Sequence, residues 1–275
     1  MPKRGVKNSF FSHFGKYLAS MKIGFTSETI YPANYLSESI LVVVRVAIMA
    51  ALYRISLGYL DASEVGNLNV AEIVWILMIT ESVRYSVFSV ARPIQDAIQN
   101  GDFAYQIARP YFYPLFLLTQ SFGQSIPFLA VNLSVGIAAC FFFVGPFHFS
   151  LLGLGLGLIS LFFGYLLDSV IYLIIGLSAF WFENNWPLWW IYGRAKFILG
   201  GAMIPLAVFP PLLKKVAELL PFSQTYYSAA LLIVKYDQAS FGRFFLIQLF
   251  WISTFGLIAT IMFRKGLKHV AANGG

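Results

Sequence analysis

The stretch GGAMIPLAVFPPLLKKVAELLPFSQTYYSAA, residues 200–230, decides the fold because apolar runs alternate there with prolines. Pro210 and Pro211 follow an apolar segment and precede an amphipathic one, in which leucine and valine recur at helical spacing. Pro221 ends that segment, and the apolar run after it is too short to cross a bilayer. We therefore expect residues 210–234 to form an external re-entrant segment, with an ordinary interfacial loop as the alternative.

Composition places the whole chain in a membrane. Hydrophobic residues make up 59% and charged residues 11% of the 275 residues, whereas soluble proteins average roughly 45–50% and 25%. A soluble domain of this length could not bury that much apolar surface. The single cysteine, Cys140, excludes an intramolecular disulfide and argues against a cysteine metal site.

Apolar windows of about 20 residues predict an all-α integral membrane protein with six transmembrane helices in one domain, residues 1–275. The predicted spans cover residues 37–58, 70–91, 113–144, 151–180, 197–209 and 244–263. The third and fourth are long enough to tilt, and Pro127 offers a kink in the third. Splitting both would give eight spans, but no cluster of turn residues interrupts either, so six are preferred.

The distribution of Lys and Arg predicts the orientation. Of nineteen basic residues, twelve lie in the N-terminal segment, the C-terminal tail and the loops after spans two and four. The opposite loops, 59–69 and 145–149, contain none, so the positive-inside rule predicts cytoplasmic termini in the cytoplasmic (inner) membrane. The longer outside segment departs from the rule, because it holds Lys214, Lys215, Lys235 and Arg243. Its amphipathic helix would place them among outer-leaflet headgroups.

The net charge of +7 requires no nucleic acid as a partner, because the basic residues border the spans, where anionic membrane lipid attracts them. Residues 8–30 combine aromatic and aliphatic side chains with Lys16 and Lys22, which predicts an interfacial helix on the inner leaflet. Four tryptophans between residues 181 and 190 indicate an interfacial aromatic belt, with an aromatic ligand cage as the alternative.

Residues 92–110, RPIQDAIQNGDFAYQIARP, form a hydrophilic connection between the second and third spans. Ile94 and Ile98 share one helical face, and Gly101 follows as a helix breaker. We expect a short cytoplasmic helix and a turn. A solvated connector is the alternative to a docking surface, and the mixed apolar face favours docking.

Three stretches resemble the permeases of type-2 ATP-binding-cassette (ABC) exporters. The external stretch matches I-P-L-x-x-F-P and L-P-F-x-x-x-Y, the tail matches a basic R-x-G-L ending, and the loop matches G-x-[IF]-x-x-x-[IL]-x-[RK]-P. The matching residues are Ile204, Pro205, Leu206, Phe209, Pro210, Leu220, Pro221, Phe222, Tyr226, Arg264, Gly266, Leu267, Gly101, Phe103, Ile107, Arg109 and Pro110. The resemblance extends over nearly the whole chain, although only these stretches are distinctive.

The resemblance implies partners and roles. The loop would be the coupling helix that docks into an ATPase subunit, and the proline-rich stretch would form an external gate. The coupling residues would be Gln99, Gly101, Asp102, Phe103 and Arg109, and the gate residues Pro205, Pro210, Pro211, Pro221 and Tyr226. A pair of separate ATPase subunits would hold ATP and Mg, so this chain needs no cofactor. A second permease, identical or related, would complete the transporter.

Charged residues within the predicted spans need partners, because each costs roughly 2.5–3.5 kcal/mol on insertion scales. Arg45, Glu81, Arg84 and Asp168 are the four residues concerned. Arg45 with Glu81 and Arg84 with Asp168 are the expected interhelical pairs, and Glu81 could also pair with Arg84 within one helix. A role in a translocation path is the alternative to structural pairing.

Nothing in the sequence predicts an enzyme. There is no Walker A motif, and the three histidines stand apart without a hydrolase or metalloprotease pattern. Gly153, Gly155 and Gly157 indicate close helix packing and not a nucleotide loop. We therefore expect an exporter permease for an unidentified apolar or amphipathic substrate. The alternatives are an ion-coupled secondary transporter or channel that uses the four charges, and a membrane scaffold.

Overall fold

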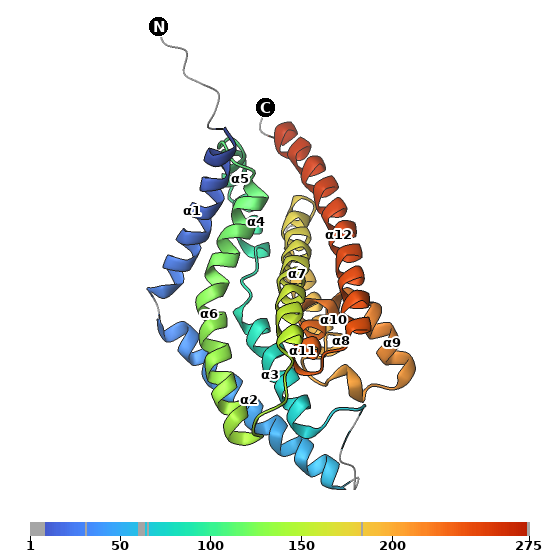
Figure 1. Ribbon diagram of the computed structural model, residues 1–275. Helices are drawn as coiled ribbons and strands as arrows, with labels where there is room; N and C mark the ends of the chain where they lie inside the picture. Colours follow the sequence, from blue (N-terminus) through green and yellow to red (C-terminus); the bar gives the residue numbers. More distant parts are fainter. Residues whose placement is uncertain (1–8, 31, 60–63, 65, 183, 274–275) are drawn as a thin grey trace.

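The computed structural model describes residues 9–273 except 31, 60–63, 65 and 183, and this part of the chain is helical, with no strand. The helices are α1 (Ser9–Thr29), α2 (Pro32–Tyr59), α3 (Val70–Ser86), α4 (Ala91–Gln99), α5 (Asp102–Ile107), α6 (Tyr113–Phe143), α7 (Leu151–Leu177), α8 (Trp186–Leu199), α9 (Pro211–Leu219), α10 (Pro221–Thr225), α11 (Tyr227–Val234) and α12 (Gln238–Asn273), with the 3-10 turns η1 (Ser178–Phe180) and η2 (Leu206–Val208). The start of α1, the pair α4–α5 and the end of α12 lie at one end of the molecule (Figure 1). The fold is therefore an all-α bundle, as predicted.

Five segments of the described chain are long and apolar enough to cross a membrane. They are Leu36–Ser56, Val70–Gln99, Tyr113–Phe143, Leu151–Phe180 and Gln238–Lys268. Helices α6 and α7 each run without interruption, and α6 accommodates Pro127 in its interior. The structure thus gives no support to the alternative in which these two spans are split.

The predicted fifth span, residues 197–209, is wrong as a helix. Helix α8 already begins at Trp186 and ends at Leu199, and the chain then continues through turns to η2. Gly201 takes a φ of +73°, which a side chain would disfavour, and Pro205 removes a backbone donor. The helical part of this segment therefore lies in the tryptophan-rich stretch that the sequence indicated as an interfacial belt.

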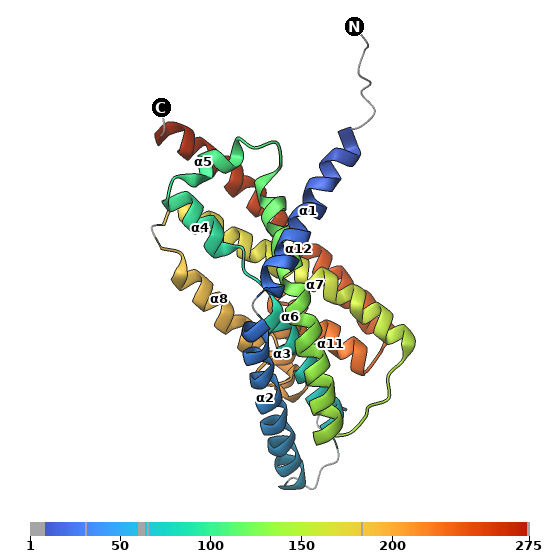
Figure 2. The same ribbon diagram turned by 90° about the vertical axis from the view of Figure 1, so that its left-hand side faces the viewer.

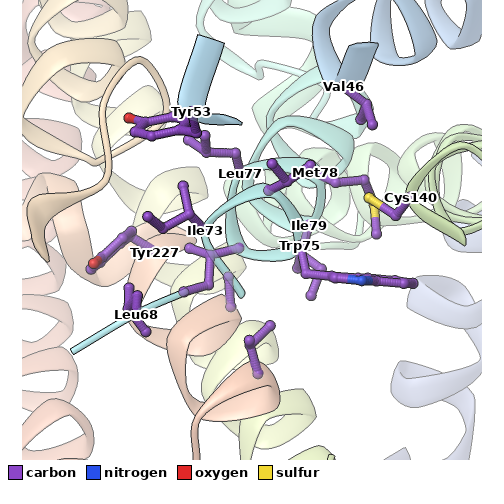
Figure 3. Close-up of a cluster of buried hydrophobic side chains, with 14 of the residues drawn as sticks. Val46, Tyr53, Leu68, Ile73, Trp75, Leu77, Met78, Ile79, Cys140 and Tyr227 are labelled. Carbon is purple, nitrogen blue, oxygen red and sulfur yellow. The ribbon is translucent and has the colours of Figure 1, made fainter. Parts of the chain in front are cut away.

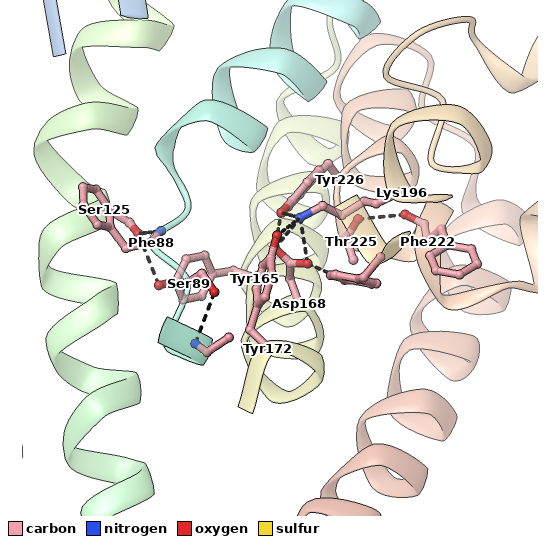
Figure 4. Close-up of polar contacts among 12 residues, drawn as sticks. Phe88, Ser89, Ser125, Tyr165, Asp168, Tyr172, Lys196, Phe222, Thr225 and Tyr226 are labelled. Carbon is pink, nitrogen blue, oxygen red and sulfur yellow. Dashed lines mark hydrogen bonds and ion pairs between the residues drawn. The ribbon is translucent and has the colours of Figure 1, made fainter. Parts of the chain in front are cut away.

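The predicted second span, residues 70–91, is also interrupted. Helix α3 ends at Ser86, and the chain passes residues 87–89 without helical structure before α4 starts. The Ser121 hydroxyl donates to the Phe88 carbonyl, and the Phe88 N–H donates to the Ser125 hydroxyl at 3.3 Å, so both backbone groups of Phe88 have partners (Figure 4). Irregular backbone at this depth is tolerated where neighbouring helices satisfy it, and α6 does so here.

Helix α3 forms the centre of the larger apolar cluster, between α2, α6 and α11 (Figure 3). Trp75 and Met78 are buried there, and a Cβ atom added at Gly136 on α6 would lie 2.6 Å from the Met78 sulfur. In a membrane the lipid is as apolar as these side chains, so close van der Waals packing stabilises such contacts. Glycine at position 136 makes this packing possible.

Helix α1 packs along the first half of α6 (Figures 1 and 2). Cβ atoms added at Gly24 and Gly123 would lie 2.1 and 2.0 Å from backbone oxygens of the facing helix, and the Ser20 hydroxyl donates to the Phe116 carbonyl at 2.8 Å. The bounds of α1 agree with the predicted N-terminal helix at 8–30. Its position on the inner leaflet stays a prediction, and the structure shows that α1 packs against α6 of the same chain.

The external segment folds back along α7. A Cβ atom at Gly164 would meet the Thr225 carbonyl at 2.1 Å, and one at Gly157 would meet the Ile233 side chain at 2.4 Å. Helix α11 therefore runs antiparallel to α7 and packs closely on Gly157, as predicted, whereas Gly155 has open space at its Cβ position and does not take part in this packing. The turn between α10 and α11 lies close to the level of Gly164, so this segment re-enters the bundle and does not stay on its surface.

Candidate functional site

A carboxylate and two guanidinium groups form the first polar cluster, between α2 and α3. Glu81, which is 2% exposed, accepts hydrogen bonds at 2.7 Å from Arg45 Nη1 on α2 and at 2.7 Å from Arg84 Nη2 on its own helix. The predicted pair of Arg45 with Glu81 is therefore present, and Glu81 also pairs with Arg84 three residues later in the same helix. One carboxylate shared by two guanidinium groups leaves this cluster with one excess positive charge.

Aromatic rings surround these arginines. The Arg45 and Arg84 guanidinium groups lie 5.2 and 5.3 Å from the ring centroid of Phe197 on α8, and Arg84 lies 4.1 Å from that of Tyr85. Both arginines remain partly exposed, with side chains at 30% and 23%. They line a groove of about 360 Å³ between α2, α3 and α8. Cation–π contacts stabilise the arginines on the groove wall without neutralising them.

The second polar cluster joins α7, α8 and the re-entrant segment. Lys196 Nζ donates to both carboxylate oxygens of Asp168 at 2.9 Å, and it also donates to the Tyr226 hydroxyl at 2.8 Å (Figure 4). The Tyr192 and Tyr226 hydroxyls donate to Asp168, and Lys196 contacts the Tyr172 hydroxyl at 3.3 Å. Asp168 and Lys196 are buried, so each charge has its partners within the protein.

This arrangement corrects the predicted pair of Arg84 with Asp168. Arg84 contacts Glu81, whereas Asp168 contacts Lys196, one of the basic residues in the predicted loop after the fourth span. The error follows from the misplaced fifth span, because the 197–209 boundary left Lys196 outside the membrane. A signal was present: Tyr192 precedes Lys196 by four residues, so both lie on one face of a helix, and that face carries a hydroxyl beside the ammonium.

Tyr226 lies in this cluster and not at the outer end of the molecule. It follows α10 directly and is 1% exposed, and its ring contacts Lys196 at 4.8 Å from the centroid. Asp168 is about 25 Å along α7 from the first residue of that helix. The re-entrant segment thus carries Tyr226 deep into the bundle, and its role in an external gate stays a prediction.

The prolines of the predicted gate occupy helix starts and turns. Pro211 and Pro221 stand at the first positions of α9 and α10, where a missing N–H costs nothing. Pro210 precedes α9, and Pro205 precedes η2 and is buried. These positions explain why the external segment breaks into short helices. Their role in a gate stays a prediction.

The predicted coupling loop is a pair of short helices joined by a tight turn. Helix α4 ends at Gln99, and Gly101 then takes a φ of +79° with open space around its Cβ position. Gly101, Asp102 and Gln99 are exposed at the tip. Arg109 is exposed as well, and hydrogen bonds with Tyr105 and Tyr111 raise its pKa, so its charge persists at every physiological pH.

Phe103 is an exception among the predicted coupling residues. It is 1% exposed, and its ring packs edge-to-face on Phe180 and Tyr113 at centroid distances of 5.0 and 5.6 Å. A Cβ atom at Gly266 of α12 would lie 2.3 Å from the same Phe180 ring, so the helix approaches it closely. Phe103 therefore anchors α5 to the bundle and does not present a surface to a partner.

These features together define a class: a polytopic α-helical membrane protein with a re-entrant segment and a compact helical pair at the end where α1 starts and α12 ends. The model of a family described as ABC-2 family transporter protein matches residues 45–274. The chain therefore belongs to the ABC-2 transporter family and is the membrane-spanning permease of an ABC transporter. The family implies an ABC ATPase as partner, and its permeases are typically non-catalytic. No curated protein matches the sequence.

Proposed function

We propose that this chain is the permease subunit of an ABC exporter in the cytoplasmic membrane, with both termini on the cytoplasmic side. A pair of separate ATPase subunits supplies the energy, and a second permease, identical or related, completes the path. The cargo is an apolar or amphipathic molecule. Family membership supports the permease role, while direction, partners and orientation are the parts that we add.

The pair α4–α5 is the observation that carries this proposal. It projects an exposed tip at residues 99–102 from the same end of the molecule as the start of α1 and the end of α12 (Figure 1). Arg92 is exposed on α4, and Arg109 is exposed in the turn that follows α5. A short, polar, helical tip with a fixed turn suits docking into a cleft of a soluble ATPase.

The pair is also connected rigidly to the bundle, as force transmission requires. Phe103 packs on Phe180 at the end of α7, and a Cβ atom at Gly176 would lie 3.0 Å from the backbone of Ala91, so α4 sits directly against α7. Movement of the tip would therefore move α7 and, through Phe180, α12. Such shifts of packed helices are a common route from a ligand-driven step to a change in the membrane.

The ion-coupled alternative is less consistent with the polar clusters. A carboxylate that carries protons or ions across a membrane must be able to exchange them, whereas Glu81 and Asp168 are each held by cationic groups at 2.7–2.9 Å. Both pairs join neighbouring helices and act as structural links in this state of the protein. We therefore keep the exporter assignment.

Gly101 and Gly145 provide a matched test of the docking surface. Both have φ near +80° and open space around Cβ, but Gly145 lies in the loop between α6 and α7, at the opposite end. Valine in this conformation is strained by about 1–2 kcal/mol at either site. We expect G101V combined with D102K to abolish most of the co-purification of a Walker A ATPase with the tagged chain, while G145V retains it.

The measurement is the molar ratio of ATPase to permease after purification from native membranes in mild detergent. Equal amounts of both variants in the membrane fraction serve as the control for insertion. If the G101V, D102K chain retains as much ATPase as the G145V chain, α4–α5 is not the docking surface.

A further inference from the structure

The groove beside the Arg45–Glu81–Arg84 cluster has a charge that the protein does not neutralise. Arg194 of α8 also lines this groove, and its guanidinium lies 5.2 Å from the ring centroid of Trp190. No carboxylate of the described chain lies within ion-pair distance of Arg194. Three arginines therefore face one space, with only the shared Glu81 carboxylate among them.

Other charges nearby do not cancel this excess. Lys196 lines the deep part of the groove, but its partner Asp168 offsets it fully. Glu38, seven residues before Arg45 on α2, interacts electrostatically with Arg84 and does not line the groove. With Glu38 counted and all groups ionised, the described residues around the groove still carry one net positive charge.

The walls of the groove are aromatic and its surroundings are apolar. Tyr85, Trp189, Trp190 and Phe197 contribute rings to the lining. On α2, the apolar side chains of Leu41 and Ile48 flank Arg45 in sequence and are 49% and 55% exposed. A charged centre with apolar flanks matches a ligand that has an anionic head and an apolar tail.

A second groove adjoins this one on the side of α4. Ser89 and Trp189 line both this groove and the second one, of about 570 Å³, which is bordered by Arg92, Gln95 and Asp96 of α4. Helix α8 lies beside α4 and the interruption between α3 and α4 (Figure 2). Because Arg92 and Asp96 offset each other, the net positive charge lies in the groove with the three arginines.

We propose that the groove between α2, α3 and α8 binds the anionic headgroup of an amphipathic molecule through Arg45, Arg84 and Arg194, with its apolar tail along the exposed face of α2. This inference rests on the proposed function, because it names the chemical class of the cargo or of a lipid that accompanies it. Guanidinium groups suit phosphate and carboxylate heads, since they donate paired hydrogen bonds to them.

Binding of a fluorescent alkyl phosphate to the purified full-length chain in a neutral maltoside detergent tests the proposal. R194Q removes the arginine that has no carboxylate partner among the described residues, so it should weaken binding about tenfold or more without unfolding the chain. R264Q removes an exposed arginine near the end of α12 and should leave binding unchanged. An alkyl glucoside with the same tail should compete poorly, because it lacks the charge.

Two competitors identify the source of the anionic head. Displacement by phosphatidic acid assigns the groove to a bilayer lipid, and displacement only by single-chain phosphates assigns it to another amphiphile; both support the proposal. If inorganic phosphate displaces the fluorescent alkyl phosphate at the same concentration as the alkyl phosphate itself, the apolar tail adds nothing to binding. That result overturns the proposal that the ligand is amphipathic. Equal loss of affinity in R194Q and R264Q overturns the site itself.

A second permease that fills the groove is the remaining outcome, and a cysteine tests it. Gly193 lines the groove with open space at Cβ, so G193C in a Cys140→Ala chain should react with a thiol reagent, and the alkyl phosphate should protect it. Disulfide-linked dimers through position 193, with no protection by the amphiphile, would make the groove an interface and overturn the proposal. Because these assays need no ATPase, their failure leaves the coupling assignment standing, and failed ATPase co-purification leaves the binding result standing.

Discussion

Asp168 and Lys196 illustrate how a membrane protein keeps charges in its interior. Each is buried, and tyrosine hydroxyls from α7, α8 and the re-entrant segment complete their hydrogen bonds. Removing one partner of such a pair leaves the other charge unmatched in a medium of low polarity, whereas replacing both can be nearly neutral. The ion pair and its tyrosines therefore hold α7, α8 and the re-entrant segment in fixed positions relative to one another.

A double-mutant cycle at this pair should show strong coupling. D168N and K196M should each lower the free energy of unfolding by about 3 kcal/mol or more, and the double variant should lose clearly less than the sum. Thermal unfolding of the purified chain, followed by the loss of soluble protein in detergent, reports the three values. Additive losses would mean that Asp168 and Lys196 do not depend on each other.

Arginines 45 and 84 serve a different purpose from Lys196. They share one carboxylate and keep part of their surface open, whereas Lys196 is 4% exposed and its charge is fully matched. The first cluster therefore remains available to an external anion, and the second does not. This contrast separates the candidate binding residues from the structural pair.

At the scale of the elements, glycines determine how closely α7 approaches the re-entrant segment. Gly164 leaves no room for a side chain against Thr225, whereas Gly155 on the same helix has open space at Cβ. A methyl group at position 164 must push backbone away from backbone, and overpacking of this kind costs typically 1–3 kcal/mol. At position 155 the same change adds helix propensity and no clash.

We therefore expect G164A to destabilise the chain and G155A to be neutral or slightly stabilising. G164A should also expose the α10–α11 turn, so a cysteine in place of Ser223, which is buried, should react faster with a thiol reagent in that background. Thermal unfolding and the labelling rate measure both effects. If G164A were as stable as G155A, and the cysteine at position 223 reacted at an unchanged rate, α10 would not pack against α7 as described.

Apolar windows of about 20 residues located α2, α6, α7 and the middle of α12, because long apolar runs have few alternative explanations in a membrane. They failed at residues 186–209, because the helix there is α8 (Trp186–Leu199), whose side chains are mostly exposed except Tyr192 and Lys196, and residues 200–209 form turns. Composition cannot show that a lysine will meet an aspartate twenty-eight residues away, since that depends on tertiary packing. The interruption after Ser86 was missed for the same reason, because its hydrogen-bond partners are on α6.

At the scale of the whole molecule, the two ends differ in character. The end with α4–α5 carries the exposed Arg92, Arg109 and Lys268, while the exposed Lys215 is on α9, which lies beside the first turns of α12, away from that end (Figure 1). Arg243 and Glu218 form an ion pair at 2.8 Å that ties α9 to the start of α12. The positive-inside rule supports our proposal that the α4–α5 end faces the cytoplasm.

Single cysteines should report this orientation in intact cells. In a Cys140→Ala background, K215C should react with a membrane-impermeant thiol reagent added outside, because Lys215 is exposed on α9. K268C should react only after permeabilisation. Reaction of K268C from outside, or of K215C only in permeabilised cells, would reverse the orientation and would move α4–α5 away from any cytoplasmic ATPase.

Coupling to a separate ATPase through α4–α5 is the central claim, and site-specific photo-crosslinking from position 102 tests it most directly. A photoreactive amino acid in place of Asp102, irradiated in the native membrane, should capture a protein whose sequence, read by mass spectrometry, contains a Walker A motif. The same amino acid at position 145, at the opposite end, should not capture it. Capture of no such ATPase at position 102, or its equal capture at position 145, would contradict the account.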